Sequence, residues 1–147
     1  MCIRDSFGIA QYACQTYRNC KPFNPILGET FEFLTPQFKY IGEQVSHHPP
    51  VSAAFADSDS YELQMQSNVK MSIGMGKLIA TAIGFQHVRL KRWGEHYTIK
   101  RPQTAVKNLI FGTTYVEQFG EMEVYNYQTG EICVIEFKTE GLSLIHI

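Results

Sequence analysis

Short segments of alternating or β-branched residues, separated by turns, fill most of this 147-residue chain and constrain its fold more than any other feature. Tyr61–Gln66 alternates apolar and polar residues without a break, which is typical of a half-buried strand. Glu121–Tyr127 and Glu131–Phe137 flank Gln128-Thr129-Gly130, which predicts a hairpin with glycine at a positive-φ position. The other expected strands are Phe31–Leu34, Phe38–Ile41, Lys77–Ile83, Gln86–Lys91, His96–Ile99, Val106–Phe111 and Thr113–Phe119. About ten strands with short connections and no helices between them predict an antiparallel sheet, a sandwich or a barrel.

The end of one helix is expected before these strands. Phe7–Tyr17 contains no proline and places apolar residues such as Ile9 and Ala13 at a spacing compatible with a helix. Pro22 ends this segment, because the residue before a proline avoids the helical region. The chain is therefore predicted to be mainly β (α+β).

The composition excludes several classes of function. Apolar residues make up 44% of the chain and charged residues 18%, which argues against a disordered protein. Thirteen basic and fourteen acidic residues leave a net charge of −1, and nucleic-acid binding needs clustered excess Lys and Arg, so no nucleic-acid partner is expected. No apolar run approaches the ~20 residues of a membrane span, and no signal peptide is expected. The four cysteines lack a CxxC spacing, which predicts reduced thiols in a cytosolic protein rather than a disulfide framework or a metal site.

The segment Lys21–Glu29, with the sequence KPFNPILGE, is the first candidate for a functional site. Two prolines three residues apart, with Asn24 between them, predict a stiff loop that is not helical. Gly28 then allows a turn or a close approach of the backbone. Lys21 stands at the mouth of this loop. On the residues alone, a surface lysine before a structural loop is the more common case.

The segment Glu43–Pro50, with the sequence EQVSHHPP, is the second candidate. The two prolines exclude a helix and favour an extended approach, so His47 and His48 are expected at the end or rim of a strand. Adjacent histidines there could bind a metal, act as a general base with its helper, or bind an anion as paired donors. No third metal ligand lies nearby in sequence, and no Ser or Cys nucleophile motif accompanies the pair, so no catalytic residue is assigned.

Both segments, in their order along the chain, resemble a known family. EQVSHHPP is similar to the signature of the oxysterol-binding protein family, the lipid-exchange proteins also called oxysterol-binding-related proteins. KPFNPILGETFE resembles the other hallmark of that family. The stretch VKNLIFGTTYVEQFGEMEVYNYQTGEICVIEFKTEG looks like the family's barrel strands. The resemblance covers about Phe7 to Gly141.

This resemblance implies a fold and a function. The implied fold is part of a large antiparallel β-barrel around a lipid tunnel, preceded by helices and a lid. The implied activity is the exchange of a sterol or another lipid against phosphatidylinositol 4-phosphate between membranes, without cofactor or covalent catalysis. In the family, the lysine of the first loop and the paired histidines hold the inositol phosphate, which carries over to Lys21, His47 and His48. Gln11 and Tyr12 are expected to contact lipid in the tunnel. A cytoplasmic protein that binds membranes transiently, at endoplasmic reticulum contact sites, is expected.

Two alternatives belong to other classes. A hydrolase would use His47 or His48 as its base, and a purely structural β module would pack the pair internally and bind no ligand. The resemblance also implies a larger domain, so residues 7–141 are expected to be one part of it. The ends, MCIRDS (1–6) and LSLIHI (142–147), resemble translated adapter sequence and are expected not to be native.

Overall fold

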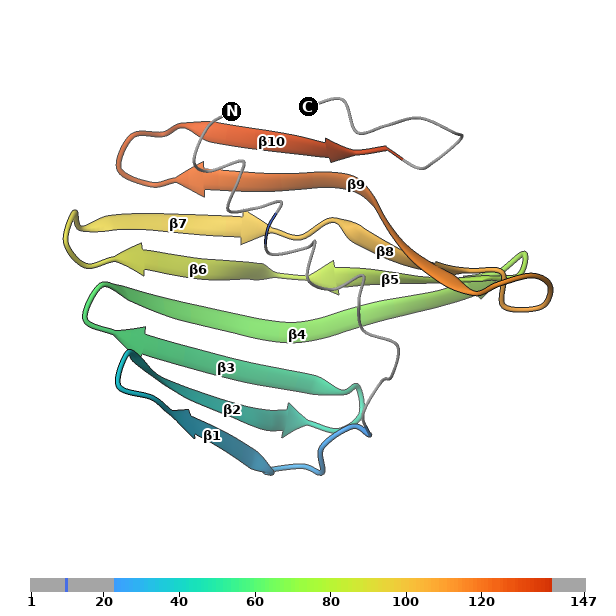
Figure 1. The fold of residues 1–147 in the computed structure, drawn as a ribbon, viewed down its shortest axis with the longest axis horizontal. Coiled ribbons are helices and arrows are strands. Elements are labelled where there is room, and N and C mark those ends of the chain that lie inside the picture. Colours follow the sequence, from blue (N-terminus) through green and yellow to red (C-terminus); the bar gives the residue numbers. More distant parts are fainter. Residues whose placement is uncertain (1–9, 11–22, 139–147) are drawn as a thin grey trace.

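The computed structural model describes Ala10 and residues 23–138, and its strands form one antiparallel sheet (Figure 1). The ten strands are β1 (Thr30–Leu34), β2 (Phe38–Ser46), β3 (Val51–Ser58), β4 (Tyr61–Gly74), β5 (Lys77–Ile83), β6 (Phe85–Leu90), β7 (Glu95–Lys100), β8 (Gln103–Lys107), β9 (Tyr115–Asn126) and β10 (Ile132–Phe137). None of the described residues belongs to a helix with the length and hydropathy of a membrane span.

The strands follow one another as an up-and-down meander with two interruptions. β4 pairs with β6 through Tyr61–Gln64 and with β5 through Asn68–Gly74, so β5 and β6 lie end to end beside it (Figure 1). Gly84 separates β5 from β6 with a φ of +83°, and a Cβ at this glycine would lie 2.2 Å from the side-chain nitrogen of Gln66. β7 and β8 share β9 in the same way, and Pro102, which has no N–H to donate, lies between them. Each pair of short strands is therefore one long strand broken by a glycine or a proline.

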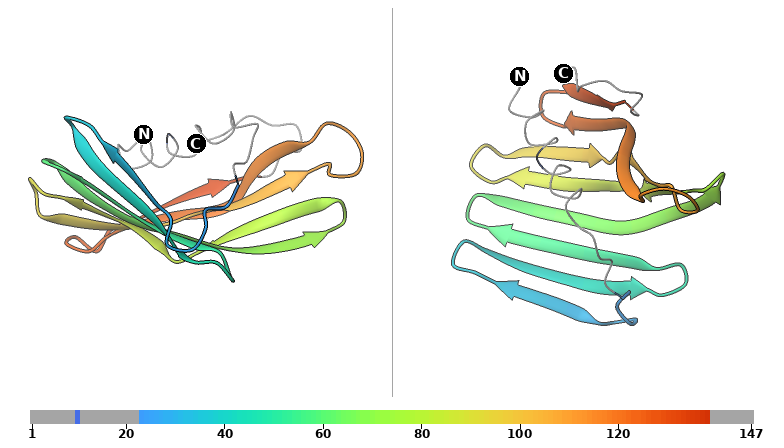
Figure 2. Two further views of the ribbon diagram at one scale, coloured as in Figure 1. Left: turned by 90° about the horizontal axis from the view of Figure 1, so that it is seen from below. Right: turned by 45° about the vertical axis from the view of Figure 1, so that its right-hand side comes forward.

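The meander is bent, and its outermost strands have one partner each among the described residues. Figure 2 shows the bend most clearly in its left-hand view. β1 pairs with β2 and β10 pairs with β9. A bent antiparallel sheet whose outer strands have no second partner within the described part of the chain is the arrangement expected of an incomplete barrel wall.

The two faces of the sheet differ in chemistry. Directly opposite residues of paired strands lie on the same face, which places Val88, Tyr97, Ile99, Val124 and Cys133 together. Ile99, Met122 and Val124 are the buried cluster on this face, and five half-buried residues pack against it: Val88, Tyr97, Cys133, Ile135 and Phe137. The alternate positions carry charged residues such as Arg89, Lys100 and Glu123. We call the first face the apolar face and the second the polar face.

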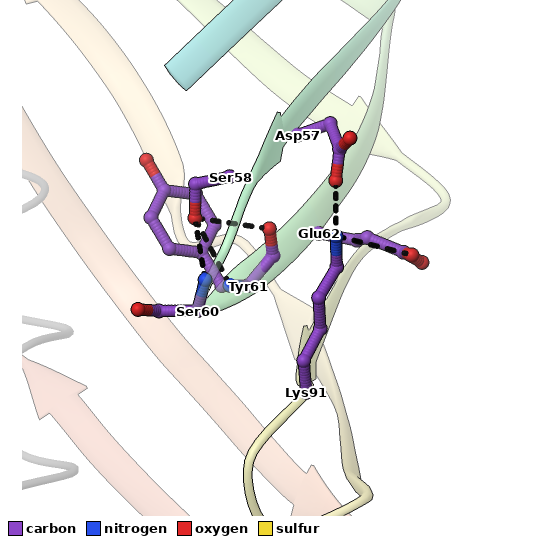
Figure 3. A network of polar contacts seen from close by, with 6 residues as sticks. All are labelled: Asp57, Ser58, Ser60, Tyr61, Glu62 and Lys91. Carbon is purple, nitrogen blue, oxygen red and sulfur yellow. Dashed lines mark hydrogen bonds and ion pairs between the residues drawn. The ribbon is translucent and has the colours of Figure 1, made fainter. Parts of the chain in front are cut away.

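One end of the sheet is fixed by a polar network, shown in Figure 3. At the turn from β3 to β4, the Ser58 hydroxyl accepts hydrogen bonds from the backbone N–H groups of Ser60 and Tyr61. The Lys91 ammonium lies 2.5 Å from Asp57 Oδ1 and 3.8 Å from Glu62 Oε1. The hydrogen bond to Asp57 raises the pKa of Lys91. Because the charged groups are about one third or more exposed, their ion pairs add little to the stability of the fold.

The structure confirms the mainly β fold and most of the expected strands, and it corrects three expectations. β3 was not expected, because its sequence VSAAFADS is rich in Ala and Ser, which have no strong preference for strands. The strand expected at Val106–Phe111 instead ends at Lys107, and Asn108 has a φ of +60°. The strands expected at Thr113–Phe119 and Glu121–Tyr127 form the single strand β9. Apart from Ala10, the helix expected at Phe7–Tyr17 lies outside the described residues.

Candidate functional site

The paired histidines lie directly after the end of β2, as the sequence predicts, in the turn that leads to β3. His47 and His48 are both exposed, and the centroids of their rings are 4.4 Å apart with an interplanar angle of 53°. The predicted extended approach is wrong in detail, because residues 47–50 form a turn in which the His48–Pro49 peptide bond is cis. Two imidazole rings are thus displayed side by side at one end of the sheet, where a ligand can reach both.

A β-bulge lies directly before this turn. Gln44 pairs with Ser52, but the next pair is Ser46 with Val51, so Val45 is the additional residue on β2. A bulge bends its strand and increases the local twist, which changes the direction of the residues that follow. The direction of the histidine turn therefore depends on the geometry of this bulge.

The described part of the first candidate loop, Phe23–Glu29, reaches the same end of β2. The Glu29 carboxylate accepts a hydrogen bond of 2.8 Å from the N–H of Ile26, and the Glu29 N–H donates one of 3.0 Å to the Ile26 carbonyl. Gly28 has a φ of +78°, which confirms the expected turn at a conformation that favours glycine. The loop then joins β2, because the Gly28 N–H donates to the Gln44 carbonyl at 2.8 Å and the Gln44 N–H donates to the Glu29 carbonyl at 3.1 Å. The two candidate segments, far apart in sequence, are in direct contact.

Of the five residues predicted for the site, the structure describes two. His47 and His48 are adjacent at the end of β2. Lys21, Gln11 and Tyr12 lie outside the described residues.

Sequence reasoning gave no role to two residues that organise this end of the sheet, Gln44 and Ser52. Gln44 has 2% of its surface exposed. Its side chain forms hydrogen bonds with the Ser46 carbonyl and the Ser52 hydroxyl. The sequence contained one indication of this role. Gln44 is a polar residue that alternates with Tyr40 and Gly42, two uncharged residues on the same face of β2.

A second histidine pair lies on the polar face and has a different character. His87 Nδ1 and His96 Nε2 are 3.1 Å apart, and the His96 ring stacks on Tyr127 with an interplanar angle of 12°. Burial, the nearby Arg89 and His87 lower the pKa of His96. Within the described part of the chain, no group of three or more His, Cys, Asp and Glu residues could hold a metal ion. Because it lies away from the turn, this second pair offers a control for substitutions of His47 and His48.

Comparison with known proteins gives the class to which this arrangement belongs. A family model described as oxysterol-binding protein matches residues 1–145. Oxysterol-binding protein 11 of Dictyostelium discoideum is 40% identical over 138 residues, which are 92% of this chain and 24% of that protein. The crystal structure of the Osh1 ORD domain in complex with cholesterol is similar with a TM-score of 0.86 and 33% identity, covering 94% of this chain and 34% of that one. The Osh3 ORD in complex with PI(4)P from Saccharomyces cerevisiae is similar with a TM-score of 0.78 and 33% identity, covering 93% of this chain and 37% of that one.

The chain belongs to the oxysterol-binding protein family. Its meander is similar to part of the barrel-like sheet of the Osh1 domain. The chain spans about a quarter of the length of the Dictyostelium relative and about a third of the two solved domains.

Proposed function

We propose that this chain takes part in intracellular lipid binding and transfer, exchanging a sterol or another lipid against phosphatidylinositol 4-phosphate between membranes. The observation that carries the proposal is the pair His47–His48, displayed at the end of a bent sheet with one apolar face. Relatives that are 33% identical support it, since the solved Osh1 domain holds cholesterol or ergosterol and the solved Osh3 domain holds PI(4)P.

The two parts of the sheet suit the two parts of a lipid. Acyl chains or a sterol skeleton need a dry surface, which the apolar face supplies through residues such as Leu63, Met65 and Val88. A phosphate needs charged or polar donors, and charge-assisted hydrogen bonds are the strongest that side chains offer. His47, His48 and Lys21 are proposed to supply them, and Gln11 and Tyr12 to contact the lipid within the tunnel.

We propose further that residues 7–141 are one part of a larger lipid-binding domain, and that residues 1–6 and 142–147 are not native to it. The complete domain, meaning this sequence within the whole of that larger unit, is the protein in which ligand binding is to be measured. A cytoplasmic location, with transient binding at endoplasmic reticulum contact sites, follows from the proposed exchange between membranes.

Lipid exchange forms and breaks no covalent bond, so the proposed function needs no nucleophile. Turnover of an ester substrate would instead favour the hydrolase.

Lys21 gives a prediction for the first loop. Lys21→Ala in the complete domain is expected to weaken phosphatidylinositol 4-phosphate extraction about tenfold or more, because one charge-assisted contact of about 1.5–3 kcal/mol is lost. Lys21→Arg should restore part of the affinity, since a planar guanidinium replaces a compact ammonium imperfectly. Extraction from liposomes that contain the labelled lipid measures both variants. Unchanged affinity in Lys21→Ala would show that Lys21 is an ordinary surface residue.

A further inference from the structure

Gln44 is a buried polar residue at the point where the two candidate segments meet. Only 2% of its surface is exposed, although it lies next to the exposed histidine turn. A buried amide costs free energy unless its donors and acceptors are paired. The partners of Gln44 therefore explain why a glutamine is placed there.

The side chain of Gln44 spans the β-bulge. Its Nε2 donates a hydrogen bond of 2.8 Å to the Ser46 carbonyl, which is the last carbonyl of β2 before His47. Its Oε1 accepts a hydrogen bond from the Ser52 hydroxyl on β3. The amide thus spans the additional residue Val45 within β2, from Gln44 to Ser46, and also connects β2 to Ser52 on β3.

The backbone of Gln44 holds the other segment. Its N–H donates to the Glu29 carbonyl at 3.1 Å, and its carbonyl accepts from the Gly28 N–H at 2.8 Å. Gln44 is therefore hydrogen-bonded to the first loop through its backbone, and its side chain is hydrogen-bonded to the two residues, Ser46 and Ser52, that flank the histidine turn. All four contacts lie within the described residues, so they do not depend on how other segments cover the sheet.

We propose that Gln44 is a positioning residue that fixes the His47–His48 turn relative to Phe23–Glu29, the described part of the first loop. This inference rests on the proposed function, because it assigns Gln44 an effect on headgroup binding. A bulge whose additional residue is unpaired has alternative geometries, and donors must lie within about 2.7–3.2 Å of a phosphate oxygen to bind it. A side chain that holds both strands of the bulge restricts these geometries. It thereby keeps the two rings where a phosphate bound beside the first loop can reach them.

The test compares two ligands on side-chain variants that leave the backbone contacts in place. Gln44→Met has a similar length and volume but no amide, and Ser52→Ala removes one hydroxyl alone. In the complete domain, Gln44→Met is expected to weaken phosphatidylinositol 4-phosphate extraction about tenfold, the combined effect of its two lost side-chain hydrogen bonds. Sterol extraction should change less than about twofold, because Gln44 lies at the end of β2 and does not belong to the buried apolar cluster. Ser52→Ala should show a smaller loss with the same selectivity, and hydrogen exchange at the amides of Ser46, His47 and His48 should accelerate in both variants.

A matched control and a histidine double variant separate this inference from the proposed function. Gln64→Met changes an exposed glutamine on the polar face of β4 and should leave both ligands bound as before. Normal phosphoinositide extraction in Gln44→Met, alongside its loss in a His47→Ala/His48→Ala variant, would overturn the positioning role and leave the proposed function standing. Equal loss of both ligands in Gln44→Met and Ser52→Ala would show a merely structural role. If Gln44→Met does not fold, Ser52→Ala decides by the same selectivity. Retention of phosphoinositide binding in the histidine variant would instead refute the proposed function.

Discussion

Replacing both His47 and His48 with alanine is expected to abolish extraction of phosphatidylinositol 4-phosphate by the complete domain, while sterol binding survives. A phosphomonoester carries a charge of about −1.5 to −2 near neutral pH, so its affinity depends on the donors that surround it. Both rings lie in one exposed turn, and neither belongs to the buried apolar cluster. The double variant therefore removes the proposed headgroup contacts without changing the surface proposed to hold the apolar ligand. The measurement is extraction of both lipids from liposomes by the same preparation.

The chain offers a matched control for this experiment. His87 and His96 form a second close pair, but they lie on β6 and β7 and not in the turn. Replacing both with alanine should leave phosphoinositide extraction within about twofold of the parent, because these two half-buried rings lie away from the proposed site. A similar loss in both double variants would mean that histidine content or stability, and not the position of the turn, determines binding. Loss of both ligands with a disturbed circular dichroism spectrum in the His47/His48 variant would make that pair structural.

The second large effect concerns the 147-residue polypeptide by itself, which is expected to be poorly soluble or molten. Among the described residues, β1 and β10 each pair along one edge only, and unpaired edges are templates for association with other strands. Apolar side chains on these strands are also exposed, with Phe31 at 63% and Ile132 at 59%. Only Ala56, Ile99, Ala105, Met122 and Val124 are buried apolar residues among those described. So small a core gives little stability against the conformational entropy of the chain.

Size-exclusion chromatography and denaturant unfolding test this expectation. Aggregates, or a broad transition with little cooperativity, are the expected results. A monodisperse sample with one sharp unfolding transition would contradict it. That outcome would show that the described sheet is a sufficient folding unit, and ligand binding could then be measured on the short chain directly.

The alternating pattern of single segments predicted most of the fold. Tyr61–Gln66 has strict period-two alternation, and it forms the first half of β4. Gln128-Thr129-Gly130 predicted a hairpin, and β9 and β10 flank it with Gly130 at a φ of +72°. In both cases the local pattern and the tertiary structure favour the same conformation, so the sequence was sufficient.

The remaining differences arise where partners outside the segment determine the conformation. β3 has a weak intrinsic preference for a strand, but it pairs with β2 on one side and β4 on the other. The apolar run Leu109–Phe111 suggested a strand, yet Asn108 turns the chain and its side chain bonds the Thr113 carbonyl at 3.1 Å. Contacts between distant segments are not encoded in the periodicity of either one.

In the candidate site, too, some features follow from the local sequence and others depend on contacts with other segments. Two histidines followed by two prolines predicted a displayed pair at a strand end, because prolines exclude helix and end strands. The bulge and the role of Gln44 could not be predicted in this way, since they depend on the register of β2 against β3 and on Gly28 and Glu29 of another segment. Predicting them required the pairing of the strands, which the sequence did not specify.

The most direct test of the central proposal is to observe the histidine rings while the headgroup binds. A short-chain phosphatidylinositol 4-phosphate is titrated into the complete domain, and the ring signals of its labelled histidines are followed by nuclear magnetic resonance. The proposed site predicts saturable shifts of the His47 and His48 signals, with the His87 and His96 signals unchanged. Saturable binding of the lipid without any shift at His47 and His48 would contradict it.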